Sequence, residues 1–422
     1  MLAFIIAFSL AFAAALIFYF VRSLPRLACW TYAFRKQDRL INEEKNRIAI
    51  LIPARDESKS VGRLFEDIVA QDYPRELFDV HVIVADPDDA TVKMAKECGF
   101  FSLAVTDQTC KSDALDACMR KILAEDESKY DAYLIIDADC GLAPDFLTEM
   151  NNALSTDADI VCSKKVVKNY FYGTLKECTM SACCNGLIWT MLDNLGNRYK
   201  SAKGYPCFTV GTGLMLTADV IKEKGGWPYK KTLTEDIELM YEAALDHRKF
   251  VYYEHAVLYM EEAQKLSVTN KRRRRWLTGV VQSERLYRKA VKKGCTRGEN
   301  YYTRGLKPIF GLMGVPAVYC GVMAIMAVVL GVMRDPLWGL CLTLSISTLA
   351  LIYLSLLAFT VLAMLSDRKN IRLPIRRKIA LALVHPLFYM QYIYIVGKPL
   401  IFPTKAGGTW EVIERVDFNE EK

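Results

Sequence analysis

Histidine is scarce in this sequence of 422 residues, which contains only His81, His247, His255 and His385. No two of them have the spacing of metal ligands, so we interpret all four as structural. The thirteen cysteines lack the spacing of a disulfide framework. Cys183 and Cys184 are adjacent, and no C-x-x-C motif pairs with a second one. A reduced domain that faces the cytosol is therefore favoured over a domain built on disulfides.

Long apolar runs are absent from the middle of the chain and occur only towards its two ends. The first covers residues 1–21. Three more follow Tyr302, at roughly 308–333, 338–365 and 379–397. Each has about the 20 apolar residues that a bilayer-spanning helix needs. Pro386 and Gln391 interrupt the last run, which could cross the membrane or lie partly in the interface. A cleaved signal peptide is the alternative for the first run, but this run is long and no charged region precedes it.

Basic residues flank these runs unevenly. Five cations follow the first run between Arg22 and Arg39, and Asp367–Lys378 is densely basic between the third and fourth runs. Because positive flanks stay in the cytosol, the chain between them should be cytosolic and the N-terminus should face out. Transporters bury ionisable residues at mid-span, whereas these runs are nearly free of charge, which argues against a transporter with a regulatory domain. We predict an integral protein of the cell membrane, in contact with membrane lipids.

Strand and helix patterns alternate through the first hundred residues of the region between the apolar ends. Arg47–Pro53, Val80–Ala85 and Tyr133–Ile136 are short apolar runs typical of buried parallel strands, and helical patterns separate them. This alternation predicts a doubly wound α/β sheet. Ligands of such sheets lie beyond the carboxyl ends of the strands. Asp86 and Asp137 each follow a strand and are therefore placed to meet one ligand.

Three short motifs carry possible chemistry. Asp137 and Asp139 are two carboxylates on one turn, where they could hold Mg²⁺ or Mn²⁺ together with a diphosphate, although turns are rich in Asp for other reasons. Thr234-Glu235-Asp236 precedes an apolar helical pattern. It could be a simple helix cap, or Asp236 could be a general base for a hydroxyl group.

The third motif is the run of five cations that ends at Trp276, from Lys271 to Arg275. It could lie among lipid headgroups, or its guanidinium groups could grip a diphosphate while the indole forms a flat wall. Recognition of nucleic acid is disfavoured for a chain with four apolar runs.

Seven stretches, in this order, resemble the processive-type family 2 glycosyltransferases: cellulose, chitin, hyaluronan and poly-N-acetylglucosamine synthases. Ceramide glucosyltransferases share the same set. The stretches are Ile52-Pro-Ala-Arg-Asp-Glu57, Ala70-Gln-Asp-Tyr-Pro74, Val82-Ile-Val-Ala-Asp86, Asp137-Ala-Asp139, Gly211-Thr-Gly213, Thr232-Leu-Thr-Glu-Asp236 and Arg272-x-x-Arg275-Trp276. The resemblance covers about residues 45–290 and the flanking apolar runs. Each motif alone is a weak signal, but seven in order are a specific one.

The resemblance implies a GT-A type α/β domain that binds a nucleotide sugar and is inserted between transmembrane helices. It also implies roles for the matched residues. The nucleotide sugar would contact Glu57, Asp86, Asp137, Arg272, Arg275 and Trp276. The metal, Mg²⁺ or Mn²⁺, would be held by Asp139 and Asp137. Asp236 would be the catalytic base with Glu235 beside it, and the acceptor site would be lined by Gly211, Thr212, Gly213 and Trp276.

The sequence departs from the family pattern in three places. Asp56 stands where Asn is usual, and Lys111-Ser-Asp-Ala-Leu115 replaces a common Lys-Gly-x-Ala-Leu, which predicts only a weak role for Lys111. Arg272 stands where the polymerising synthases usually carry Gln. This last difference bears on whether the product is a polymer.

The implied function is inverting transfer of a sugar from a nucleotide-sugar donor, expected to be a UDP-sugar, to a growing polysaccharide. Non-processive transfer of one sugar to a lipid or lipid-linked acceptor is the alternative. No nucleic-acid partner is expected, and the sequence indicates no particular protein partner. The expected division of the chain is an N-terminal transmembrane helix at 1–22, a cytosolic catalytic domain at 45–260, an interfacial segment with R-x-x-R-W at 261–305, a transmembrane region of about three helices at 306–400 and a tail at 401–422.

Overall fold

A mixed β-sheet forms the centre of the α/β domain. The computed structural model describes residues 1–27, 29–171, 178–297, 306 and 314–401. Among these, eight strands form one sheet in the order β3-β2-β1-β4-β7-β6-β8-β5. The strands are β1 Ile48–Pro53, β2 Phe78–Val84, β3 Phe101–Ala104, β4 Ala132–Ile135, β5 Gly141–Leu142, β6 Ile160–Val167, β7 Leu214–Thr217 and β8 Phe250–Met260. The three strands predicted from apolar runs are thus confirmed as β1, β2 and β4, within one or two residues at their ends.

Helices cover both faces of the sheet. Side chains alternate along a strand, so Ile50 of β1 packs on one face and Leu51 on the other. The first face is covered by α3 (Val61–Val69), α4 (Ala90–Glu97) and α6 (Phe146–Leu154), and the second by α5 (Lys111–Asp126), α9 (Ala218–Lys224) and α10 (Glu235–Leu245). Burial on both faces explains why these strands are continuous apolar runs. The predicted doubly wound α/β class is confirmed.

The strand directions bring several loops to one edge of the sheet. β2, β1 and β4 are adjacent and parallel, so their carboxyl ends lie together. β7 runs antiparallel beside β4, with Leu214 opposite Ile135. The chain that enters β7 therefore lies beside the chain that leaves β4. This places Gly211–Gly213 next to Asp137.

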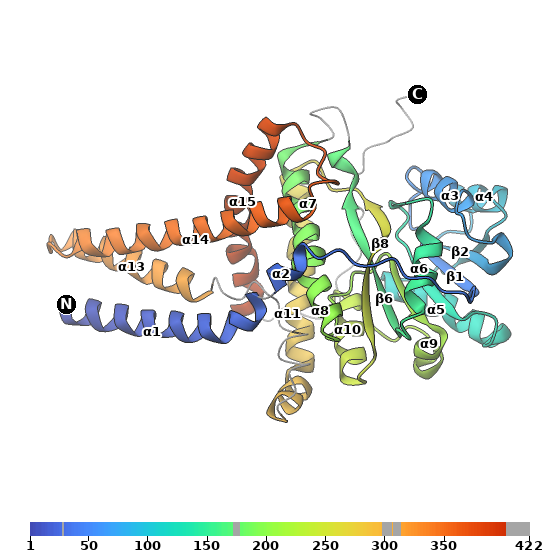
Figure 1. The fold of residues 1–422 in the computed structure, drawn as a ribbon, viewed down its shortest axis with the longest axis horizontal. Coiled ribbons are helices and arrows are strands. Elements are labelled where there is room, and N and C mark those ends of the chain that lie inside the picture. The colour runs from blue at the N-terminus through green and yellow to red at the C-terminus, as the bar shows by residue number, and fades with distance from the viewer. Residues whose placement is uncertain (28, 172–177, 298–305, 307–313, 402–422) are drawn as a thin grey trace.

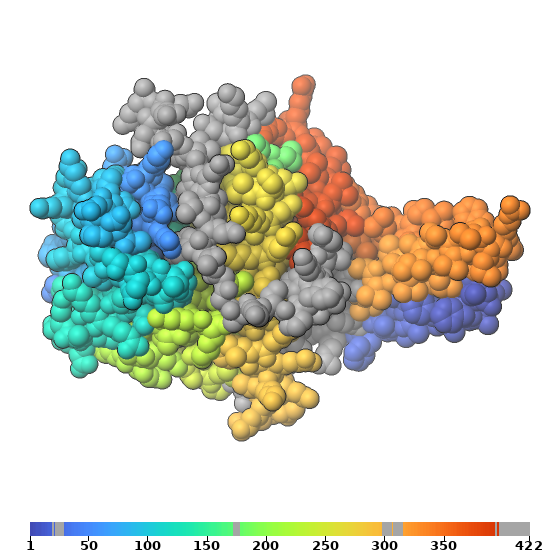
Figure 2. All heavy atoms as spheres, turned by 180° about the vertical axis from the view of Figure 1, so that it is seen from behind, coloured from blue at the N-terminus to red at the C-terminus, as the bar shows by residue number. Residues whose placement is uncertain are grey.

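Three apolar helices project from one side of this domain (Figures 1 and 2). They are α1 (Leu2–Leu27), α13 (Gly314–Val332) and α14 (Trp338–Ser366). Val315–Val332 and α14 are long and apolar enough to cross a bilayer, and α1 has a shorter apolar stretch at Leu2–Phe18. Many of their mutual contacts are apolar or aromatic, as where Phe12 stacks on Tyr319 with ring centroids 3.8 Å apart, and the hydroxyl groups of Ser9 and Tyr319 also share a hydrogen bond of 2.7 Å.

Two further helices lie across the direction of α14 (Figure 1). α11 (Leu266–Thr296) carries the cationic run, and α15 (Ile375–Ile401) covers the last predicted apolar run. They pack against each other and against α7 (Met180–Leu192). Among the described residues, α15 lacks the composition of a membrane span, so a third C-terminal crossing stays a prediction. Residues 298–305 of the predicted interfacial segment and 402–422 of the predicted tail lie outside the described residues.

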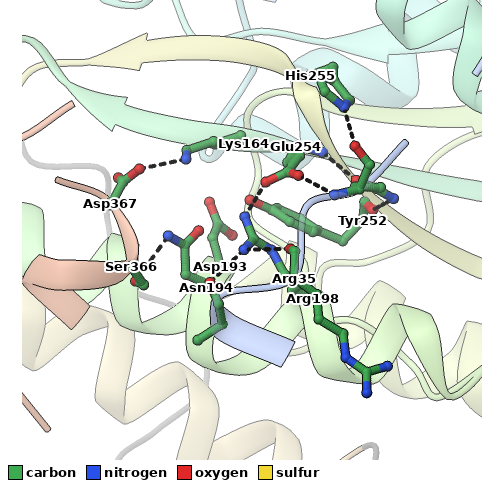
Figure 3. Close-up of polar contacts among 12 residues, drawn as sticks. Arg35, Lys164, Asp193, Asn194, Arg198, Tyr252, Glu254, His255, Ser366 and Asp367 are labelled. Carbon is green, nitrogen blue, oxygen red and sulfur yellow. Dashed lines mark hydrogen bonds and ion pairs between the residues drawn. The ribbon is translucent and has the colours of Figure 1, made fainter. Parts of the chain in front are cut away.

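Polar contacts tie the α/β domain to the segments next to the apolar helices (Figure 3). The ammonium group of Lys164 on β6 lies 2.6 Å from the carboxylate of Asp367, which follows α14. Arg198 of α8 (Arg198–Ala202) pairs with Glu254 of β8 and donates to the carbonyl oxygen of Arg35 at 3.1 Å. Lys164 and Asp367 are both buried. The domain is therefore fixed against the chain on both sides of the apolar bundle.

Candidate active site

The carboxyl ends of the parallel strands carry three of the residues expected at the nucleotide. Glu57 follows β1, Asp86 follows β2 and Asp137 follows β4, with β1 in the middle. Asp86 is exposed and accepts from the backbone N–H of Asp88 at 2.9 Å. Glu57 is half-buried, and its carboxylate accepts from the hydroxyl of Ser60 at 2.6 Å. The three side chains thus lie along one edge of the sheet, where a single extended ligand can meet them.

Asp56 has a left-handed backbone conformation, with φ of 56°. Among residues with a side chain, Asn and Asp adopt this conformation most readily. The replacement of the usual Asn by Asp at this position therefore preserves the turn after β1 that presents Glu57.

Lys111 joins the strand ends to the start of α10. Its ammonium group lies 2.5 Å from the carboxylate of Asp137, 2.5 Å from the carbonyl oxygen of Gly211 and 3.9 Å from the carboxylate of Glu235. Burial alone would lower the pKa of Lys111, but the carboxylates of Asp137 and Glu235 outweigh it and raise that pKa. Lys111 is thus a charged crosslink at the centre of the site. The sequence indicated only a weak role, because the motif around Lys111 departs from the family pattern.

The loop Gly211–Gly213 lies between the two groups of carboxylates. The N–H of Gly211 donates to the carboxylate of Asp236 at 2.8 Å, and the hydroxyl of Thr212 accepts from the backbone N–H of Asp137 at 3.0 Å. Gly213 has φ of 61°, and a Cβ there would lie 2.1 Å from the hydroxyl oxygen of Ser163. The second glycine of this loop is therefore required by both conformation and space.

Asp236 lies in the first turn of α10 beside Glu235. Its carboxylate accepts from the backbone N–H groups of Gly211 and Ile237, the latter at 2.9 Å. Burial and the neighbouring charge of Glu235 raise the pKa of Asp236 to about 7, although Lys111 opposes this shift. A carboxylate with this pKa is ionised in a large fraction of molecules near neutral pH and is still basic enough to accept a proton. The side chain of Thr234 makes no capping hydrogen bond, so the simple capping interpretation of this motif is not supported for Thr234.

Asp137 and Asp139 form a donor set that suits a hard divalent cation. Burial and the charge of Asp139 raise the pKa of Asp137, while Lys111 opposes them, so two negative charges here are costly without a cation. No group of three or more His, Cys, Asp or Glu side chains among the described residues could hold a metal ion. Mg²⁺ and Mn²⁺ in phosphate sites need only one or two carboxylates, because phosphate oxygens and water fill the other positions. The residues therefore fit the expected metal.

Four consecutive arginines of α11 have different surroundings. Arg273 is buried, with its guanidinium carbon 3.7 Å from the ring centroid of Phe388 and its Nε donating to Asn185 at 2.9 Å. Arg275 is exposed and Arg272 is half-buried. The sequence pattern had singled out Arg272 and Arg275, and it missed Arg273, which is the one held by packing.

Trp276 is half-buried and packs edge-on against Trp189 of α7, with ring centroids 5.6 Å apart. The indole N–H of Trp189 donates to the buried carboxylate of Glu262 at 2.5 Å. The sequence motif singles out Trp276 but neither Trp189 nor Glu262.

Comparison with known proteins places these features in context. The family model "Glycosyltransferase like family 2" matches residues 46–279. The mannosyltransferase PcManGT from Pyrobaculum calidifontis, solved with GDP-Man and Mn²⁺, has a similar fold with a TM-score of 0.51 and 15% sequence identity. The match covers 86% of this chain and 97% of that one. TarS 1–349 of S. aureus, solved with UDP-GlcNAc, is more distant, with a TM-score of 0.39, 12% identity and coverage of 82% and 92%. No curated protein sequence matches the chain.

Proposed function

This chain belongs to glycosyltransferase-like family 2, whose model matches more than half of its length, and we propose that it transfers a sugar from a nucleotide-sugar donor with inversion at the anomeric carbon. The observation that carries the proposal is the environment of Asp236. Its carboxylate is aimed by two backbone N–H groups, and its pKa is raised to about 7 by burial and by Glu235. These are the properties of a positioned general base.

In the proposed reaction, Asp236 accepts the proton of an acceptor hydroxyl group. The oxygen attacks the anomeric carbon from the face opposite the diphosphate, and the bond to the nucleoside diphosphate breaks with its electron pair. Glu235 keeps the pKa of Asp236 high, and Lys111 keeps the neighbouring carboxylates in place. Because the attack and the departure occur on opposite faces, the product has inverted configuration.

The donor is proposed to lie along the carboxyl edge of β2, β1 and β4. Asp86 and Glu57 would contact the nucleoside, and Asp137 would contact the nucleotide from β4. A divalent cation held by Asp137 and Asp139 would offset the negative charge of the departing diphosphate. Arg272 and Arg275 would meet the same diphosphate from α11. We propose a UDP-sugar as donor on the family resemblance.

The acceptor is proposed to be bound at the membrane, with Gly211–Gly213 and Trp276 on its side of the site. The apolar helices α1, α13 and α14 would be inserted in the bilayer, with the catalytic domain in the cytosol as the basic flanks predict. A growing polysaccharide was the expectation from the resemblance. Transfer of one sugar to a lipid is the alternative. The described contacts among α1, α13 and α14 are mostly apolar, around Met323, Ala327 and Leu330, which suits a lipid acceptor, but they include the hydrogen-bonded pairs Ser9–Tyr319 and Cys320–Ser345.

Product analysis of the purified protein in detergent tests this function. The protein is incubated with a panel of nucleotide sugars, including UDP-linked hexoses and N-acetylhexosamines, together with membrane lipid extract. Release of nucleoside diphosphate with one donor is expected, and it should stop with excess chelator and return with Mn²⁺ or Mg²⁺. A product of fixed mass supports transfer of one sugar, and a mass that grows with time supports a polymer. No release with any donor would overturn the proposal, and full activity in excess chelator would remove the metal.

A further inference from the structure

Glu262 is a buried carboxylate that the proposed reaction does not use. It follows β8, and 2% of its surface is exposed. Its backbone is clamped by the side chain of Asn169, which accepts from the N–H of Glu262 at 2.9 Å and donates to its carbonyl oxygen at 3.3 Å. Asn169 is itself fully buried. A two-way amide clamp of this kind fixes the backbone, so the position of the carboxylate is set before any ligand binds.

The carboxylate of Glu262 holds one side chain in particular. The indole N–H of Trp189 donates to it at 2.5 Å, and hydrogen bonds to ionised acceptors in buried sites are among the stronger ones in proteins. Burial raises the pKa of Glu262, while the charge of Arg272 opposes this shift. The ring of Trp189 packs edge-on against Trp276, whose partly buried side chain belongs to the same apolar cluster.

We propose that Glu262 is a positioning residue for Trp276: its carboxylate fixes the indole of Trp189, and that indole fixes the orientation of the ring on which the acceptor sugar stacks. The inference rests on the proposed function for the acceptor role of Trp276, but the geometry of the three side chains does not. Trp276 is only half-buried and packs against the ring of Trp189, so its orientation depends on the packing of its neighbours.

The short helix that holds Glu262 also contacts the turn that carries Asp139. Asn169 follows Lys168, whose ammonium group donates to the backbone carbonyl oxygen of Asp139 at 3.3 Å. Two consecutive side chains of the short helix η2 (Lys168–Tyr170) therefore contact the metal-binding turn and the Glu262 segment. Through them, the tryptophan pair (Trp189 and Trp276) is held at a fixed place relative to the donor.

Hydroxyl-radical footprinting of the full-length protein in detergent, read by peptide mass spectrometry, tests the inference without an activity assay. In Glu262→Ala and in Trp189→Phe, the oxidation rate of Trp276 should rise by about fivefold, since the hydrogen bond that holds the indole of Trp189 is lost in each. Glu262→Gln should behave like the wild type, because its amide oxygen still accepts from Trp189. The double variant Glu262→Ala/Trp189→Phe should be no worse than either single variant, since both break one chain of contacts.

The buried Trp227 is an internal reference for unfolding. If Glu262→Ala exposes Trp227, the variant is unfolded, and Trp189→Phe, which keeps an aromatic ring in place, decides the question. An unchanged Trp276 rate in the folded variants would overturn the proposal, as would an equal increase in Glu262→Gln.

A kinetic measurement distinguishes a loss of acceptor positioning from a general loss of activity. With membrane lipid extract as acceptor, Glu262→Ala should raise the KM for the extract by about tenfold, the usual worth of one such hydrogen bond. The KM for the donor and the slow hydrolysis of the donor by water should not change. An equal loss in hydrolysis and transfer would contradict a role at the acceptor. If the wild type uses no nucleotide sugar at all, the proposed function fails, while the footprinting result still decides the geometry.

Discussion

The two sides of the candidate site are built by different physical means. On the strand side, the carboxylate cluster (Asp137, Asp139, Glu235 and Asp236) is held by charge, with Lys111 between its members. On the helix side, α11 is held by aromatic packing, with Arg273 over Phe388 and Trp276 against Trp189. One side should therefore respond to pH and to changes of charge, whereas the other should respond to changes of shape.

This difference matches the tasks of the two sides in the proposed reaction. Proton transfer and departure of a diphosphate need groups whose charge is set in advance. For the acceptor, the proposal relies on the ring of Trp276, which packs against Trp189 of α7 and belongs to an apolar cluster with Phe388 of α15. Substitutions that keep shape but change charge should thus separate the two sides, and so should those that keep charge but change shape.

The largest effect is expected for Asp236→Asn on the charged side. The amide oxygen of Asn can still accept from the N–H of Gly211, so fold and donor binding should survive. An amide cannot take a proton from a hydroxyl at neutral pH, so transfer should fall by roughly 10²–10⁴-fold. Single-turnover kinetics and donor titration measure the two quantities. Near wild-type turnover would remove Asp236 as the base and direct attention to Glu235.

The pH dependence of transfer by the wild type should follow the ionisation of Asp236. Because the pKa of Asp236 is raised to about 7, its ionised form increases as the pH rises through that value. The rate of transfer should therefore rise by about tenfold between roughly pH 6 and pH 8 and level off above, as expected for a single base. A rate that is flat or falls over this range would contradict the assignment.

Lys111 and Glu235 should move this profile in opposite directions. The charge of Lys111 lowers the pKa of Asp236, and the charge of Glu235 raises it. Lys111→Met should consequently shift the rise in rate to higher pH, and Glu235→Gln should shift it to lower pH. The two variants are controls for each other, since a general disturbance of the site would shift both alike. Initial rates across the pH range measure the shifts.

Much of the strand side could be predicted from the sequence, because it depends on local patterns. A buried strand followed by Asp is visible as an apolar run, and the parallel arrangement brings Asp86 and Asp137 to one edge. Lys111 could not be assigned in this way, because its partners Asp137, Gly211 and Glu235 are remote in sequence and meet only in the folded sheet. The sequence also gave no sign of which arginine of α11 is buried.

The helix side was harder to predict because packing decides it. Trp189 lies in a helix whose apolar residues have the spacing typical of a core helix. Its N–H contact with Glu262, which is visible only in the structure, distinguishes it from an ordinary core residue. The third C-terminal apolar run was expected either to cross the membrane or to lie partly in the interface. In the structure it forms α15, which packs against α11 and α7 and lies across α14 (Figure 1).

A substitution that keeps charge should affect the helix side alone. Arg273→Lys loses the planar stack on Phe388 and the fork of donors to Asn185, so the free energy of unfolding should fall by about 1–3 kcal/mol. The pH profile of transfer should keep its shape, since Arg273 does not contact the carboxylate cluster. Arg274→Lys, at an exposed position of the same helix, is the matched control and should change stability by less than about 0.5 kcal/mol. Equal losses in the two variants, measured by thermal or denaturant unfolding, would show that packing of Arg273 is not what holds α11.

The smallest effect is expected where the two sides touch, at Thr234. A threonine before a helix usually caps it, and loss of such a cap costs about 1 kcal/mol. Here the hydroxyl of Thr234 is buried without a hydrogen-bond partner, and the side chain packs against Gly279 of α11. Thr234→Ala removes a buried methyl group, which destabilises the fold by about 0.8 kcal/mol. It also removes a buried hydroxyl group that has no hydrogen-bond partner, which stabilises the fold by a similar amount or more. Stability should therefore stay within about 0.5 kcal/mol of the wild type.

Thr179 provides the contrast, because its hydroxyl does accept from the N–H of Ala182 at the start of α7, so Thr179→Ala should lose the usual amount of about 1 kcal/mol. If unfolding experiments showed the reverse order, the side chain of Thr234 would act as a true cap of α10, and its contact with Gly279 would not explain the missing capping hydrogen bond.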